Sequence, residues 1–127
     1  MSKKVHLSEN APKPIGPYSQ AIEANGIVFF AGQIPLDAKS GELIKGGVSD
    51  QAKKVMENIS AVLTSADLTF DQIVKTTIFL VDMNDFAAVN EVYGQYFKGA
   101  PPARSTIAVA ALPRGARVEV EVTACRN

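Results

Sequence analysis

Residue types that build many catalytic and structural centres are scarce in this chain. Its 127 residues include one cysteine, one histidine and no tryptophan. The single cysteine excludes an internal disulfide framework and a metal site made of several cysteines. The single histidine, His6, excludes a centre with two or three imidazole ligands, and a Ser-His-Asp triad would depend on this one residue. The glycine-rich fragment IKGG lacks the spacing of a phosphate-binding loop. We therefore expect no bound metal and no cofactor.

Net charge and long apolar runs are missing as well. Thirteen basic and thirteen acidic residues cancel to a formal charge of zero. This balance argues against nucleic acids and membranes as partners bound through bulk charge. No segment reaches the roughly 20 apolar residues that span a bilayer. The first 14 residues contain no apolar core of signal-peptide length. The sequence thus predicts a cytoplasmic protein that works without a membrane.

The length and the hydrophobic pattern predict one domain, residues 1–127, of the α+β class. Alternating apolar residues indicate strands, and apolar residues at three- and four-residue spacing indicate helices. A hairpin with an Asn25-Gly26 turn is predicted, and Ser49 is expected to cap the first helix. Strands are expected near 3–7, 21–24, 27–35, 72–82, 103–112 and 116–125, and helices near 50–66 and 84–99. The order predicts a six-stranded mixed sheet with two helices on one face. The other face then lacks cover, which favours packing against further copies of the chain.

Arg104 is the most conspicuous polar residue in a segment that otherwise resembles a strand. No acidic residue lies within ten positions of it. Strand alternation places Arg104 and Thr106 on one face together with small alanines. A buried guanidinium needs an anion, and it binds a carboxylate through two parallel hydrogen bonds. The pattern therefore predicts a pocket for a small anion beside Arg104.

Two further polar positions allow more than one interpretation. Asn90 is spaced to lie on the apolar side of the second helix, between Phe86 and Tyr93. A buried asparagine must be hydrogen-bonded, either within the structure or to a ligand. Glu119 and Glu121 alternate with valines in the last strand. They either line a solvated face or provide a carboxylate for the pocket.

Several separated motifs together resemble one known family. They are IGPYSQ at 15–20, AGQIP at 31–35, VKTTIFLVDMNDFAAVNEVYGQYF at 74–97, PARS at 102–105 and LPRGARVEVE at 112–121. In this order they resemble the RidA/YjgF family of reactive intermediate deaminases, known under an older label as L-PSP endoribonucleases or translation inhibitors. The resemblance implies a fold similar to the chorismate mutase trimer, a homotrimer with active sites between subunits. It also implies hydrolysis of reactive 2-enamines and 2-imines, such as 2-aminoacrylate and 2-iminopropanoate, to a 2-keto acid and ammonia.

The resemblance also implies roles for individual residues. Arg104 corresponds to the arginine that binds the substrate carboxylate, and Glu119 to the glutamate that positions and activates water. The other positions that correspond to the family's substrate site are Tyr18, Ala31, Gly32, Asn90 and Thr106. Ala31 replaces a serine and Thr106 a cysteine found in many members, so one hydroxyl hydrogen bond and any cysteine redox chemistry at position 106 are missing.

Two other functions fit parts of the pattern. A small-carboxylate-binding regulatory protein would retain the Arg104 pocket without turnover. An endoribonuclease fits less well, because the chain has no basic stripe, no stacking platform and a single histidine for acid–base cleavage.

Overall fold

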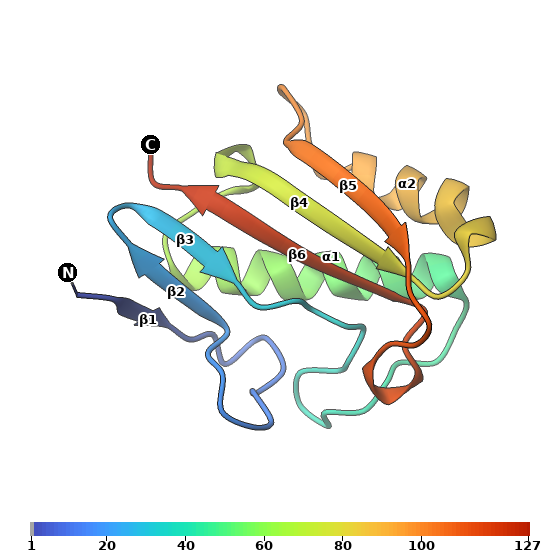
Figure 1. Cartoon of the computed structure of the whole chain (residues 1–127). Coiled ribbons are helices and arrows are strands. Elements are labelled where there is room, and N and C mark those ends of the chain that lie inside the picture. The colour runs from blue at the N-terminus through green and yellow to red at the C-terminus, as the bar shows by residue number, and fades with distance from the viewer. Residues whose placement is uncertain (1) are drawn as a thin grey trace.

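A single six-stranded mixed sheet forms one layer of the protein, and two helices cover one of its faces (Figure 1). This computed structural model describes residues 2–127. The strands are β1 (Lys4–His6), β2 (Ala21–Ala24), β3 (Ile27–Phe30), β4 (Ile73–Leu80), β5 (Ala103–Ala108) and β6 (Val118–Cys125), and the helices are α1 (Val48–Ser65) and α2 (Phe86–Gly94). Their spatial order in the sheet is β1-β2-β3-β6-β4-β5, and only the β4–β5 pair is parallel. The predicted α+β class and element order are confirmed.

The β2–β3 hairpin forms because its turn residues tolerate a left-handed backbone. Asn25 has a φ of 53° and Gly26 a φ of 77°. Glycine adopts this conformation without strain, and asparagine is among the residues that tolerate it best. This turn is the one that the sequence predicts.

The start of α1 differs from the prediction. The helix is capped by Gly47 rather than Ser49. The Asp50 carboxylate accepts a hydrogen bond from the Gly47 N–H at 3.1 Å and so closes the first turn. Val48 is then the first helical residue, and its buried side chain joins the core. The helix begins two residues earlier because this apolar contact and the Asp50 bond favour the longer helix.

The core lies between the two helices and one face of the sheet. Val118, Val120 and Val122 of β6 point into it, together with the apolar stripe of α1. From α2, Tyr93 adds a buried ring whose hydroxyl is 2.7 Å from the Thr76 hydroxyl. This face is hereafter the helix face.

The opposite face, hereafter the open face, has no cover from residues 2–127. Its side chains include Phe29 and Ile107, which are 51% and 44% exposed. Single exposed apolar residues are normal, but several on one sheet face mark an interaction surface. The expected uncovered face is therefore present.

Three predicted elements end earlier than expected. β3 stops at Phe30, α2 at Gly94 and β5 at Ala108. Tyr96 and Phe97 lie beyond the end of α2 yet still pack, since their ring centroids lie 5.1 and 5.7 Å from that of Phe70. Apolar spacing alone thus extended the helix too far. Within residues 2–127, the structure contains no helix long and apolar enough to cross a bilayer.

Candidate functional site

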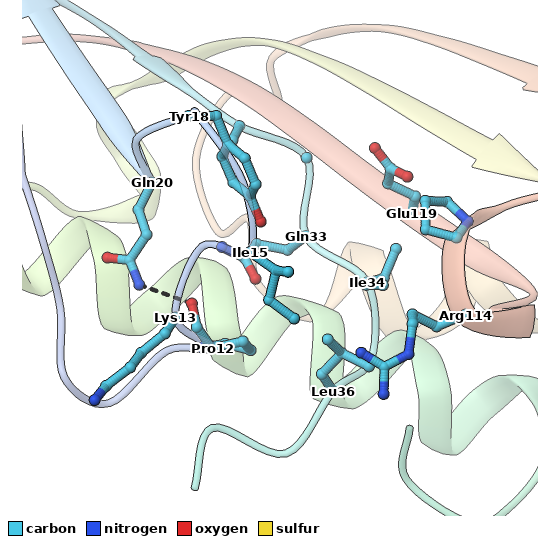
Figure 2. A pocket seen from close by; sticks show the side chains of 13 residues that line it. Pro12, Lys13, Ile15, Tyr18, Gln20, Gln33, Ile34, Leu36, Arg114 and Glu119 are labelled. Atoms are coloured by element: carbon cyan, nitrogen blue, oxygen red, sulfur yellow. Dashed lines mark hydrogen bonds between the residues drawn. The ribbon is translucent and has the colours of Figure 1, made fainter. Parts of the chain in front are cut away.

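A cavity of about 490 Å³ lies between the segment that follows β3 and the start of β6. The proline-rich arm, the segment after β3 and the turn before β6 enclose it (Figure 2). Four of the seven residues proposed from the sequence line it, namely Tyr18, Ala31, Gly32 and Glu119. The cavity is of a size that holds a small molecule.

Gly32 makes room for the Glu119 side chain. The backbone beside it is fixed, because residue 33 exchanges hydrogen bonds of 2.9 and 3.1 Å with Val120. A Cβ atom added at Gly32 would overlap the Glu119 carboxylate oxygen and lie 2.9 Å from its Cδ. Only glycine therefore allows Glu119 to take this position in the cavity.

Glu119 is partly buried in a place that disfavours its charge. Desolvation, followed by the charge of Glu121, raises the pKa of the Glu119 carboxyl above its ordinary value. No side-chain hydrogen bond or ion pair within residues 2–127 reaches this carboxylate. The solvated-face interpretation is thus wrong for Glu119, although Glu121 is exposed. A partly buried carboxyl with a raised pKa is a better proton acceptor than a solvated one, as general base catalysis requires.

Arg104 occupies a different place, at the edge strand β5. Its guanidinium donates a hydrogen bond of 2.6 Å to Asn90 Oδ1 on α2. It also lies 5.4 Å from the ring centroid of Phe86 and 5.2 Å from that of Tyr93. The hydrogen bond orients the guanidinium, and the faces of the two aromatic rings stabilise its charge. No carboxylate among residues 2–127 pairs with it, so its charge is available to an anion from outside the chain.

Asn90 and Thr106 differ from their expected surroundings. Asn90 is exposed in the chain rather than buried, because it lies at the rim of α2 where β5 leaves the sheet open. Its partner is Arg104, so it orients the guanidinium. Thr106 lies two residues further along β5, and its hydroxyl oxygen is buried without a hydrogen-bond partner within residues 2–127.

The register places the Glu119 and Arg104 groups on opposite faces of the sheet. Arg104 pairs with Thr76, which is buried on the helix face. Glu119 pairs with Phe79, whose other neighbour is Ile107 on the open face. Residues that pair directly across strands point to the same face. One chain therefore carries two separate halves of the predicted site.

The structure also adds a cavity residue that the sequence reasoning did not single out. Gln33 lines the cavity and is 8% exposed. The available signal was its place in the motif AGQIP, where a polar residue directly follows the pocket-lining Ala31 and Gly32.

The fold and the cavity define a small α+β protein built around a ligand-sized cleft with a carboxylate of raised pKa. Comparison with known proteins then gives the family. A sequence model described as Endoribonuclease L-PSP matches residues 8–126. The chain belongs to this family, which is the RidA/YjgF family that its motifs resemble.

Relatives support this assignment over nearly the whole chain. Protein DfrA of Myxococcus xanthus is 54% identical, covering 98% of this chain and 96% of the relative. A mouse protein named 2-iminobutanoate/2-iminopropanoate deaminase is 48% identical, covering 98% and 93%. The structure of YyfA from Yersinia pestis, described as a member of the conserved Rid protein family, aligns with a TM-score of 0.95 at 50% identity, covering 98% of this chain and 99% of that one.

Proposed function

We propose that the protein is a hydrolytic deaminase of reactive 2-imino acids and their enamine tautomers. In this reaction a 2-imino acid and water give a 2-keto acid and ammonia. The observation that carries the proposal is Glu119, a partly buried carboxyl with a raised pKa that lies in a ligand-sized cavity over Gly32. The mouse relative named for the same reaction supports it.

The proposal requires more than one copy of the chain. Arg104 and Glu119 lie on opposite faces of the sheet, so one chain cannot present both to one small substrate. The apolar open face offers a surface for association. We infer a homotrimer in which the cavity of one copy faces Arg104 of a neighbour. The unpaired guanidinium then meets the substrate carboxylate, with Asn90 holding its orientation.

Each side chain then has a limited task. Arg104 binds the carboxylate through two hydrogen bonds and so fixes the position of the imine carbon. Glu119 accepts a proton from water as the water oxygen bonds to that carbon. That proton passes to the nitrogen and gives a tetrahedral carbinolamine. Glu119 then transfers the hydroxyl proton to the same nitrogen, so the C–N bond breaks, ammonia leaves and the hydroxyl oxygen becomes the keto oxygen. Tyr18 lines the cavity and provides a phenol at its wall.

A competition assay tests the proposal. An amino-acid oxidase generates the imine, semicarbazide traps it, and the protein competes with the trap. We expect the wild type to reduce semicarbazone formation and Arg104→Ala to lose nearly all of this effect. Arg104→Lys should lose most of it, because lysine cannot form the bidentate contact. Arg117→Ala is the matched control, since Arg117 is an exposed arginine that pairs with Asp85 away from the cavity lining.

The outcomes separate the candidate functions. Equal competition by wild type and Arg104→Ala, both folded, would contradict the role of Arg104. Binding of a 2-keto acid without any turnover by the wild type would instead support a small-carboxylate-binding regulatory protein. Gel filtration with light scattering tests the trimer separately, and a monomer at working concentration would contradict it.

A further inference from the structure

The segment after β3 contains a β-bulge that changes which side chains face Glu119. Within β3, Phe29 pairs with Thr123, and beyond the strand Gln33 bridges to Val120. Four residue steps from Phe29 to Gln33 therefore match only three steps from Thr123 to Val120. The one extra residue marks a bulge, and the residues beyond it point to the opposite faces from those that the β3 register would give.

Beyond the bulge, the side chain of Ile34 lies on the same face as Glu119. Gln33 and Val120 bond to each other in both directions, at 2.9 and 3.1 Å, and Val120 points into the core on the helix face. Antiparallel pairing makes Ile34 and Glu119 the next pair, and successive pairs point to opposite faces. Ile34 precedes Pro35, which favours the extended backbone that this alternation needs. Ile34 is therefore an apolar neighbour of the Glu119 carboxyl on the open face.

The segment that carries Ile34 is fixed from the helix side. The Asn58 amide on α1 donates hydrogen bonds to the carbonyls of Ile34 and Leu36, at 3.3 and 3.1 Å. Asn58 is 2% exposed, so these bonds are shielded from water, and Pro35 between the two carbonyls is buried. Ile34 thus belongs to a preformed wall of the cavity.

The part of the cavity around Ile34 is apolar. Figure 2 shows the Ile34 side chain between those of Glu119 and Leu36 in this view. Other apolar residues that line the same cavity are Ile15, Leu36 and Pro113. Lys13 and Arg114 also line it, but both are exposed, so their charged ends can stay in water. The wall beside Glu119 is therefore complementary to an apolar group.

The cavity is larger than the smallest imine needs. Its volume of about 490 Å³ lies in the range that holds drug-sized ligands, whereas 2-iminopropanoate carries only a methyl group beyond its reacting carbon. With that carbon beside Glu119, a longer aliphatic substituent reaches Ile34. Burying it there removes apolar surface from water and so stabilises the complex. An apolar neighbour also agrees with the desolvation that raises the pKa of the Glu119 carboxyl.

We propose that Ile34 is a specificity-determining residue that packs against the substrate side chain, and that 2-imino acids with a branched aliphatic side chain are preferred over 2-iminopropanoate. This inference rests on the proposed function and specifies the substrate class of the same cavity. One additional methylene in an apolar pocket changes kcat/KM by about 10- to 200-fold.

Two imines of different size test this assignment, 2-imino-4-methylpentanoate and 2-iminopropanoate. We expect the wild type to prefer the larger imine by about tenfold or more in kcat/KM. Ile34→Ala should lower kcat/KM for the larger imine about tenfold, mainly by raising KM, and leave the smaller one within about twofold. Ile34→Leu keeps the aliphatic volume and should retain the preference. Val5→Ala is the control, because Val5 is a 57% exposed aliphatic residue outside the cavity lining.

Other results would overturn the assignment. A wild-type preference for 2-iminopropanoate would contradict it, and an equal fall for both imines in Ile34→Ala would show that Ile34 acts only through the structure. If Ile34→Ala does not fold, Ile34→Thr keeps the branched shape and should show the same selective loss.

Calorimetry with the stable 4-methyl-2-oxopentanoate and pyruvate keeps the test independent of turnover. If the wild type hydrolyses neither imine, tighter binding of 4-methyl-2-oxopentanoate than of pyruvate, lost in Ile34→Ala, still supports the role of Ile34. Equal binding of the two keto acids by both proteins contradicts it.

Discussion

Glu23 and Glu119 are both glutamates, but their surroundings shift their carboxyl pKa values in opposite directions. Glu23 on β2 accepts a hydrogen bond of 2.8 Å from His6 and two bonds of 2.8 Å from Arg126. These partners, Arg126 first, lower the pKa of Glu23 to about 2. Glu119 on β6 has no such partner, and burial raises its pKa.

The difference shows how each region uses a carboxylate. The Glu23 cluster joins β1, β2 and the residue after β6, and its hydrogen bonds are used within the chain. His6 is thus part of the contacts that hold β1 to β2. The Glu119 carboxylate keeps its hydrogen-bonding capacity for a ligand and for water. A fully partnered charge stabilises the fold, whereas an unpartnered one reduces stability and remains available for chemistry.

Of the substitutions at these two carboxylates and their neighbours, the one that removes the charge of Glu119 should have the largest effect on turnover. We expect Glu119→Gln to lower turnover by roughly 100-fold while 2-keto acid binding persists, since a proton acceptor is lost and the shape is kept. The same variant should be more stable than the wild type above the ordinary carboxyl pKa of 4.5, because ionising Glu119 costs the folded state more than the unfolded one.

The stability gain from Glu119→Gln should disappear below that pH, where both proteins carry a neutral group. Thermal melts between acid and neutral pH measure this. Glu121→Gln is the control, because Glu121 is exposed on the same strand. Unchanged turnover in Glu119→Gln, or an equal loss in Glu121→Gln, would assign the proton transfer elsewhere.

Displacing the Glu119 carboxylate without removing it should have the next largest effect on turnover. Gly32→Ala places a methyl group where the Glu119 carboxylate lies, and the end of that flexible side chain can shift. We expect turnover to fall by on the order of 10- to 100-fold with little loss of thermal stability. Gly94→Ala is the control, because a Cβ there meets nothing within 4 Å. Full activity in Gly32→Ala would show that the Glu119 position is not required.

Removing the charge of Glu23, the carboxylate with partners in the chain, should lower stability and leave turnover unchanged. Glu23→Gln removes the charge that Arg126 and His6 bind. We expect the melting temperature at neutral pH to fall by several degrees. Because the folded-state pKa is lowered, this stability is present above the ordinary value of 4.5 and is lost as pH falls towards about 2. The two melting curves should therefore converge over that range, and a constant difference would contradict the linkage.

The smallest expected effect concerns two threonines on the helix face. The Thr106 hydroxyl is buried without a partner, whereas the Thr76 hydroxyl bonds to Tyr93 at 2.7 Å. We expect Thr106→Val to raise the free energy of unfolding by about 1 kcal/mol, and Thr76→Val to lower it by a similar amount. Denaturant titration measures both. Destabilisation by Thr106→Val would show that its hydroxyl is satisfied in the assembled protein.

Much of the fold was predictable from local patterns. The Asn25-Gly26 turn and the alternating valines of β6 depend on residues close in the chain, and both are confirmed. Element ends were less predictable. The sequence did not show that the Asp50 carboxylate would start α1 at Gly47, or that α2 would stop at Gly94 while its last aromatic residues still pack.

The amino-acid sequence by itself determined the order of the elements, the uncovered sheet face and the identity of the polar residues that stand out, Arg104 and Glu119 among them. These properties follow from periodicity and from the cost of burying charge. Only the tertiary structure decided which of these residues meet. Strand register assigns each side chain to one face, and register joins residues distant in the chain. It therefore placed Arg104 and Glu119 on opposite faces and brought Ile34 to the face of Glu119.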